Sequence, residues 1–323
     1  MRRALLLLLF LFACTTGRAE LSFASAHAIV VDEQSGEVLL QKDEASAAPI
    51  ASLTKLMTAM VVLDAQQDPR EALRVSADDL DRLKGTHGGV PVGAVVSRGD
   101  LLTLALMASD NHAASALARN YPGGMLAFDA AVRRKIETLG LASTVIEEPT
   151  GLSPNNRSSA QDIAKLLHAA AAYPQIASIT SQRKVSVPVN GRRWTVKNTN
   201  ALVGAPGWNI LASKTGFTNE AGRCVSMRVQ AAGRTVMVVL MGALRSSERA
   251  LDALNVRRWL AGEAPLPVLP GERKTRRMAT AARHAPAAEV SPPQQGSDAA
   301  DSSAPAAAEA TSGAEPDAGQ SVK

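Results

Sequence analysis

The pattern of apolar and polar positions predicts strands near both ends of the central region and helices between them. Short apolar runs predict strands at residues 27–31, 38–41, 184–189, 193–196, 209–217, 224–229 and 235–241. Apolar residues at three- and four-residue steps predict helices over residues 49–63, 100–108, 113–118, 128–139, 160–172 and 247–261. Residues 70–100, punctuated by glycine and proline, are expected to be loop-rich, and Asp100 is expected to cap the helix that follows. This order of elements predicts an α+β fold, in which helices cover a mixed, mostly antiparallel sheet.

The predicted helix over residues 49–63 is apolar on nearly every side and therefore belongs in a core. It nevertheless carries Ser52 and Lys55 one turn apart on one face. Burial lowers the pKa of a lysine, and a neutral amine can accept the proton of a neighbouring serine. The alternative is that Lys55 extends to solvent and Ser52 only caps the helix. A second Ser-x-x-Lys pattern at Ser181 and Lys184 shows that the spacing alone does not decide between them.

Two further short motifs follow along the chain. Ser109 and Asn111 lie between two apolar helices, where they can relay a proton and hold a peptide carbonyl, or simply cap the helix ends. Lys214-Thr215-Gly216 lies in a predicted strand. On an exposed edge, such a strand can bind a peptide as an additional strand, and Lys214 and Thr215 can hold its carboxylate. The backbone N–H groups of Ser52 and Phe217 can then form an oxyanion hole.

The three motifs occur in the order Ser-x-x-Lys, Ser-x-Asn, Lys-Thr-Gly, a set closely similar to that of β-lactamases and penicillin-binding proteins. The chain resembles the low-molecular-mass penicillin-binding proteins of the serine D,D-peptidase family, which includes the D-alanyl-D-alanine carboxypeptidases. Within that family it is most similar to the D-alanyl-D-alanine endopeptidases of the penicillin-binding protein 7/8 branch. The resemblance covers residues 27–265 and is carried by stretches 50–63, 104–112, 121–124, 148–152 and 214–222. One departure is Asp110, where that branch is expected to have Glu.

The resemblance implies a β-lactamase/transpeptidase-like fold, with helices on both faces of the sheet and a helical subdomain. It also implies that Ser52 attacks a D-alanyl carbonyl, that Lys55 is the general base and that Ser109 passes the proton to the leaving amine. The implied substrate-binding residues are Asn111, Lys214, Thr215, Gly216 and Phe217. Peptidoglycan stem peptides would then be the substrates and β-lactams the acylating inhibitors.

Other functions remain open at this point. A carboxypeptidase would use the same site to release a terminal D-Ala, and a non-catalytic module would sense β-lactams or bind the wall. A β-lactamase would need Glu148 as the deacylating base, but the Asn expected shortly after it is missing. His112 is interpreted as a structural residue because Lys55 already fills the role of the base. No cofactor is expected, and no metal either, because the five histidines form no ligand motif.

The two ends of the chain predict export. Residues 1–26 have the form of a signal peptide, with cleavage after Ala19 or Ala26, which places the protein in the periplasm. Cys14 weakly resembles a lipoprotein site, and Cys224 is expected to be a buried, inert thiol. The catalytic domain is expected at residues 27–265, followed by a disordered Ala/Pro-rich tail at 266–323. A net charge of +5 and 3% aromatic residues do not favour nucleic-acid binding, and any membrane contact would be peripheral.

Overall fold

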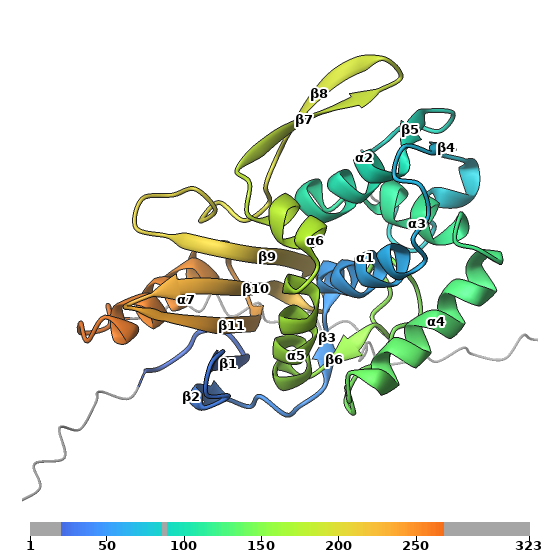
Figure 1. The fold of residues 1–323 in the computed structure, drawn as a ribbon. Coiled ribbons are helices and arrows are strands. Elements are labelled where there is room, and N and C mark those ends of the chain that lie inside the picture. The colour runs from blue at the N-terminus through green and yellow to red at the C-terminus, as the bar shows by residue number, and fades with distance from the viewer. Residues whose placement is uncertain (1–20, 86–88, 268–323) are drawn as a thin grey trace, which may run out of the picture. The chain divides into compact units, whose positions relative to one another are not determined.

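The computed structural model describes residues 21–85 and 89–267 and is built on a five-stranded antiparallel sheet (Figure 1). Its strands, in spatial order, are β2 (Val38–Lys42), β1 (His27–Asp32), β11 (Arg234–Ala243), β10 (Gly222–Ala231) and β9 (Asn209–Thr218). The first hairpin of the chain therefore pairs with its last strand, because β1 lies antiparallel to β11. This leaves β9 at an edge, where β10 is its sheet partner within the described residues.

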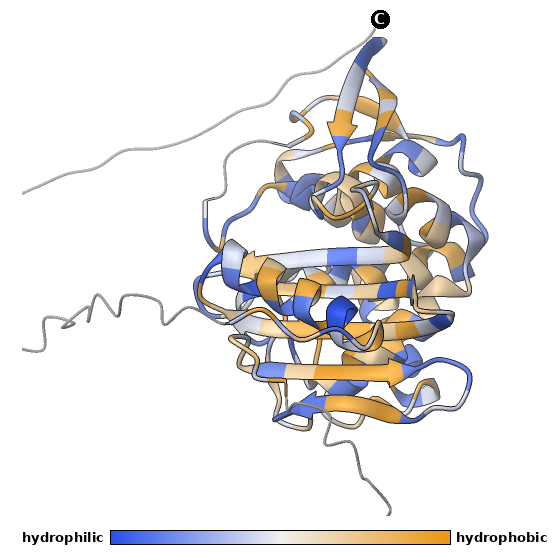
Figure 2. Ribbon diagram, turned by 90° about the vertical axis from the view of Figure 1, so that its left-hand side faces the viewer, coloured by the Kyte–Doolittle hydropathy of each residue, from blue (hydrophilic) through white to orange (hydrophobic). Residues whose placement is uncertain are grey.

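The central strands are buried on both faces, and alternate residues belong to two separate hydrophobic clusters. Met237, Val239 and Met241 of β11 belong to one cluster, and Val236, Val238 and Leu240 belong to the other. The first cluster packs with α5 (Ala160–Ala171) and α6 (Pro174–Thr180), and the second packs with α7 (Ser246–Leu260). Figure 2 shows apolar segments in orange along the strands of this sheet. The expected α+β fold with helices on both faces is thus confirmed.

A helical region precedes the last three strands of the sheet. It consists of the short 3₁₀ helix η1 (Ala51–Thr54), α1 (Lys55–Asp64), α2 (Arg98–Thr103), the π-helical segment η3 (Leu104–Ala108), α3 (Asn111–Arg119) and α4 (Gly124–Thr138). Lys55 to Val62 of α1 are all buried, as the apolar pattern predicts. No helix in residues 21–85 and 89–267 is long and apolar enough to cross a membrane.

Several local expectations were wrong. Ser97, not Asp100, caps α2, because the Ser97 hydroxyl accepts a hydrogen bond from the Asp100 N–H at 3.1 Å. The stretch at residues 70–100 is loop-rich as expected, and it also contains the antiparallel pair β4 (Ala72–Arg74) and β5 (Val95–Ser97) and the short helix η2 (Ala77–Asp79). Helix α6 was not expected, and neither was the two-residue pairing of β3 (Ala48–Pro49) with β6 (Arg157–Ser158).

The hairpin of β7 (Lys184–Val189) and β8 (Arg192–Lys197) forms a separate two-stranded sheet, seen at the top of Figure 1. It turns at Asn190-Gly191, where both residues have positive φ angles, of 49° and 72°. Its second strand leads directly into the segment before β9. The hairpin therefore lies next in the chain to the edge strand of the main sheet.

The segment before β1 is packed onto the domain. Leu21 and Phe23 are buried in the cluster beneath α7. The buried carboxylate of Asp252 accepts hydrogen bonds from the N–H of Ala24 and from both the N–H and the hydroxyl of Ser25, at 2.7–2.9 Å. Most of the expected signal peptide and of the expected tail, together with Cys14, lies outside the described residues.

Candidate active site

Ser52 and Lys55 lie together where η1 leads into α1. Lys55 is only 1% exposed, and its amine donates hydrogen bonds to the Ser52 hydroxyl at 3.0 Å and to the Asn111 side-chain oxygen at 2.7 Å. A third bond, at 2.6 Å, goes to the carbonyl of Thr150. Ser52 lies within η1 and is the N-cap of neither helix, because Ile50 holds that position in η1 and Thr54 in α1. The alternative in which Lys55 extends to solvent and Ser52 caps the helix is therefore wrong.

The environment of Lys55 makes the neutral, proton-accepting form of its amine more abundant than in an ordinary lysine. Burial lowers the pKa of its amine to about 8, although the negative charges of Glu148 and Asp110 oppose the shift. The backbone just before Ser52 is strained as well, because Ala51 has a positive φ of 47°. A hydroxyl next to an amine that loses its proton this readily can act as an activated nucleophile.

Ser109 and Asn111 reach the same place from the junction of η3 and α3. Ser109 ends η3 with a left-handed backbone at φ 60°, and its hydroxyl accepts a hydrogen bond from the Lys214 amine at 2.8 Å. Asp110, rather than Asn111, caps α3, because its carboxylate accepts from the Ala113 N–H at 2.9 Å. Asn111 is therefore free of a capping role and faces Lys55.

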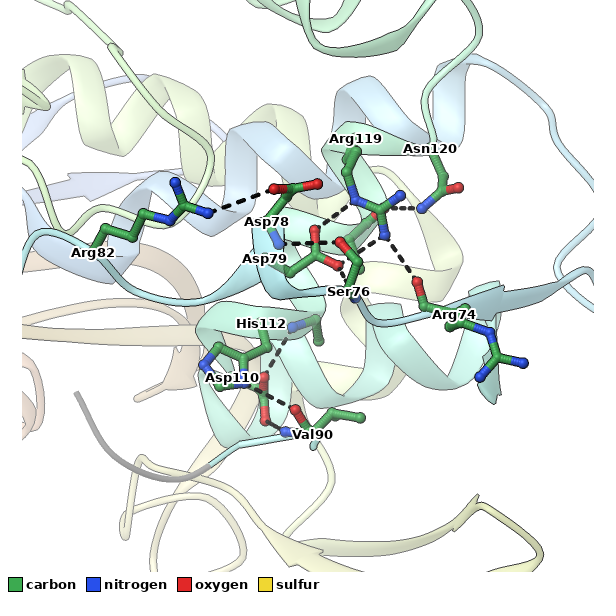
Figure 3. A network of polar contacts seen from close by, with 12 residues as sticks. Arg74, Ser76, Asp78, Asp79, Arg82, Val90, Asp110, His112, Arg119 and Asn120 are labelled. Atoms are coloured by element: carbon green, nitrogen blue, oxygen red, sulfur yellow. Dashed lines mark hydrogen bonds and ion pairs between the residues drawn. The ribbon is translucent and has the colours of Figure 1, made fainter. Parts of the chain in front are cut away.

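Asp110 and His112 contact the loop at residues 89–90 (Figure 3). The Asp110 carboxylate also accepts from the Val90 N–H, and a ring nitrogen of the buried His112 lies 2.9 Å from the Val90 carbonyl. The Asp110 carboxylate therefore binds this loop, and His112 is a structural residue, as expected.

The edge strand β9 contributes the third motif. Lys214 is 1% exposed, and its pKa lies well below the usual value because of burial, with a smaller effect from the nearby positive charge of Lys55. The Thr215 hydroxyl donates to the hydroxyl of Thr199 at 2.7 Å. Phe217 is 47% exposed, and the guanidinium of Arg223 lies 3.5 Å from the centre of its ring. The strand therefore presents a mixed polar and aromatic edge beside Ser52.

Gly216 has a structural role that the motif did not reveal. A Cβ atom at this position would lie 2.9 Å from the Ile50 carbonyl oxygen and 3.2 Å from the Ser52 nitrogen. The glycine therefore allows β9 to lie directly against η1, which brings the third motif to the nucleophile. All eight predicted site residues thus lie along η1, the start of α1, the junction of η3 and α3, and the edge strand β9.

The loop at residues 148–156 makes a contribution that the sequence motifs do not reveal. The Glu148 carboxylate accepts hydrogen bonds from the N–H groups of Thr150 at 2.7 Å and Gly151 at 2.6 Å, and from the Asn156 side chain at 3.1 Å. It therefore holds its own loop and shapes the position of the Thr150 carbonyl. The group that accepts the Lys55 hydrogen bond is the backbone carbonyl of Thr150. Because every residue has a backbone carbonyl, the sequence does not identify this one.

Residues outside this cluster behave as ordinary structural groups. The second Ser-x-x-Lys pattern is divided between the end of α6, at Ser181, and the start of β7, at Lys184. Cys224 is buried, which raises the pKa of its thiol to about 11, so it is an unreactive core residue as expected.

Comparison with known proteins identifies the family. The family model described as D-alanyl-D-alanine carboxypeptidase matches residues 14–245. The D-alanyl-D-alanine endopeptidase of Pseudomonas aeruginosa is 42% identical over 239 residues, covering 73% of this chain and 77% of that protein. The D-alanyl-D-alanine endopeptidase of Escherichia coli K12 is 40% identical over 258 residues, or 79% and 83% of the two chains. The crystal structure of the Streptomyces K15 DD-transpeptidase matches with a TM-score of 0.70 at 22% identity, over 75% of this chain and 99% of that one.

The fold and the family match define a serine peptidase of the penicillin-binding type, which confirms the resemblance drawn from the sequence motifs. The chain belongs to the D-alanyl-D-alanine carboxypeptidase family and is a serine D,D-peptidase.

Proposed function

We propose that this protein is a periplasmic D,D-endopeptidase that hydrolyses D-alanyl cross-links in peptidoglycan through an acyl-enzyme on Ser52. The observation that carries the proposal is the buried amine of Lys55, with its pKa lowered to about 8, at 3.0 Å from the Ser52 hydroxyl. Two relatives of at least 40% identity are named endopeptidases, which supports cross-links as the substrate.

In the first half of the reaction, the neutral amine of Lys55 takes the Ser52 proton while the serine oxygen attacks the D-alanyl carbonyl carbon. The N–H groups of Ser52 and Phe217 stabilise the oxyanion that forms. The C–N bond then breaks, and the proton passes through Ser109 to the departing amine. Lys214 supports this transfer by holding the Ser109 hydroxyl at 2.8 Å.

In the second half, water attacks the ester carbonyl and gives up its proton to Lys55, and the Ser52–acyl bond breaks to release the acid and restore the hydroxyl. Asn111, which is already hydrogen-bonded to Lys55, orients the substrate. The peptide lies along β9 beside Thr215, Gly216 and Phe217, as an added strand. A substrate carboxylate at this edge raises the pKa of Lys214 and keeps it a cation. β-Lactams acylate Ser52 by the same attack.

We further propose that the chain is exported and that its signal peptide is cleaved after Ala19. Cleavage after Ala26 would remove the Ala24 and Ser25 donors from the buried Asp252 carboxylate. The proposed catalytic domain spans residues 27–265, with residues 21–26 packed onto it. Leu266 also belongs to it, because its N–H and carbonyl both bond the Asn255 side chain. Residues 267–323 form the proposed tail.

The second candidate is a carboxypeptidase, which the description of the family favours. Mass spectrometry of cross-linked muropeptide dimers and pentapeptide monomers separates the two, using the mature protein, its Ser52→Ala variant, and Ser178→Ala as a control at an exposed serine. We expect the mature protein and the control to split dimers and Ser52→Ala to leave them intact. Loss of one D-Ala from pentapeptides with dimers intact would identify a carboxypeptidase. Cleavage of neither would leave a non-catalytic β-lactam sensor or wall-binding module.

A further inference from the structure

A cavity of about 450 Å³ lies at the base of the β7–β8 hairpin and is lined largely by cationic and amide side chains. We call it the cationic pocket. Its lining residues are Arg183, Lys184, Lys197, Asn198, Asn200, Ala201 and Val203. Three of the seven are cations and none is an acid. The electrostatic potential of this pocket therefore favours an anion.

The positive charge of the cationic pocket is not compensated by its surroundings. The sequence from Gln182 to Trp208 contains no Asp or Glu. Arg183, Lys184 and Lys197 are exposed, and none of them forms an ion pair with any residue in 21–85 or 89–267. Arg192 and Arg193 add two further exposed cations near the tip of the same hairpin. The hairpin is thus a local excess of positive charge on a chain of mild net charge.

The two lysines of the pocket are placed against each other. Lys184 of β7 and Lys197 of β8 are direct cross-strand partners in the antiparallel register. Like charges directly opposite on neighbouring strands destabilise a hairpin. A bound anion between them removes this repulsion, so the arrangement is more favourable with an anionic ligand than without one.

The cationic pocket is connected to the active site through three consecutive residues. Asn198 and Asn200 line the pocket, and Thr199 between them accepts the hydrogen bond from the Thr215 hydroxyl at 2.7 Å. The Asn200 side chain in turn donates to the hydroxyl of Ser213 on β9 at 3.2 Å. A peptide lying along the edge of β9 can therefore continue towards the pocket.

We propose that the cationic pocket binds free carboxylates of the acidic wall peptide whose cross-link is cut at Ser52. This proposal rests on the proposed function, because the carboxylates belong to the same peptide that the proposed endopeptidase cleaves. Arginine and lysine both bind carboxylates by charge-assisted hydrogen bonds, and two or more free carboxylates are available on a wall stem peptide. The hairpin thereby selects acidic peptides and fixes their direction along β9.

The test is a binding measurement that needs no cleavage. The full chain carrying Ser52→Ala is titrated by calorimetry with the tripeptide L-alanyl-γ-D-glutamyl-meso-diaminopimelate, and with the same peptide after amidation of its carboxylates. We expect Lys184→Gln with Lys197→Gln to weaken tripeptide binding about three- to tenfold, as expected for two exposed charge pairs. Amidation of the peptide should cause a similar loss. The matched control, Arg133→Gln with Arg134→Gln, removes two exposed cations from α4 and should leave binding unchanged.

Three results would overturn the proposal. They are equal binding by the double lysine variant, equal binding of the amidated peptide, and a lysine-dependent affinity for phosphatidylglycerol vesicles without one for the tripeptide. The last would make the hairpin a membrane-contact surface. The double lysine variant should also melt no lower than the parent, since it relieves repulsion. The muropeptide assay tests the proposed function separately. There, the proposed function fails if the mature protein, which retains Ser52, leaves the dimers uncleaved.

Discussion

The carbonyl oxygen of Thr150 accepts a hydrogen bond from the amine of Lys55 at 2.6 Å. Together with Ser52 and Asn111, it gives the buried amine three acceptors, so all three protons of the cationic form can be bonded. This contact links the proton acceptor of the proposed mechanism to the loop that Glu148 holds in place. The loop is therefore part of the proposed catalytic machinery, and it meets Lys55 through its backbone.

Glu148→Gln is predicted to change both the rate and the pH dependence of acylation. The amide is a weaker acceptor for the N–H groups of Thr150 and Gly151, so acylation by a fluorescent penicillin should slow about tenfold, the value of one charged hydrogen bond. The variant also removes a negative charge that raises the pKa of Lys55, so the rate should begin to rise at lower pH. The charges of Asp110 and Lys214 still act on the amine in this variant. Glu37→Gln, at an exposed carboxylate just before β2, should shift neither quantity. An unchanged pH profile in Glu148→Gln would contradict this role.

The pH dependence of the parent protein follows from Lys55. Its amine accepts a proton only when neutral, and its pKa lies at about 8. Acylation should therefore increase with pH up to about 8 and level off above it, measured with fluorescent penicillin between about pH 6 and pH 9. Lys55→Arg should abolish acylation throughout, because a guanidinium stays protonated. A rate that does not vary over this range would exclude Lys55 as the base.

Gly151→Ala is predicted to be far more damaging than alanine at another glycine of similar backbone. A Cβ at Gly151 would lie 2.0 Å from the Ala51 carbonyl oxygen, next to Ser52. Gly140 also has a positive φ, of 60°, but a Cβ there meets nothing within 4 Å. We expect Gly140→Ala to cost about 1 kcal/mol in the free energy of unfolding, from backbone strain alone. Gly151→Ala should cost about 3 kcal/mol or more and also slow acylation, because the Ala51–Ser52 backbone must move. Urea unfolding measures the cost in the free energy of unfolding for both variants. Similar costs for both variants would contradict the proposed close contact.

The start of the mature chain can be predicted from Asp252. Its buried carboxylate depends on donors from Ala24 and Ser25, so a chain beginning at His27 should be less stable than one beginning at Glu20 by about 3 kcal/mol. Mass spectrometry of the exported protein should find Glu20 as the first residue. A mature protein that begins at His27 and unfolds at the same urea concentration would show that these contacts are dispensable.

The elements of the fold could largely be predicted from local patterns. The apolar runs place β9, β10 and β11 correctly to within a few residues, and Asn190-Gly191 fixes the β7–β8 turn. Predictions of helix caps were wrong where two nearby residues could each cap the same helix. Ser97 caps α2 in place of Asp100, and Asp110 caps α3 in place of Asn111. Helix α6 was missed because its seven residues are too few for a periodic pattern.

The candidate site was predictable where side chains carry the chemistry. Ser52, Lys55 and Asn111 meet because their residue types and spacings define motifs. The Thr150 carbonyl could not be predicted, because every residue has a carbonyl and only the folded loop brings this one to Lys55. The resemblance implies that Gly216 binds substrate, whereas the structure shows that this glycine allows β9 to approach η1.

The most direct test of the account is to locate the covalent adduct. The mature protein is incubated with benzylpenicillin, digested, and analysed by mass spectrometry beside its Ser52→Ala variant. We predict that the mass of one intact benzylpenicillin is added to the peptide containing Ser52, and that the variant gains no adduct. An adduct on Ser109 or on any other residue, or an adduct that persists in Ser52→Ala, would contradict the assignment of Ser52 as the nucleophile.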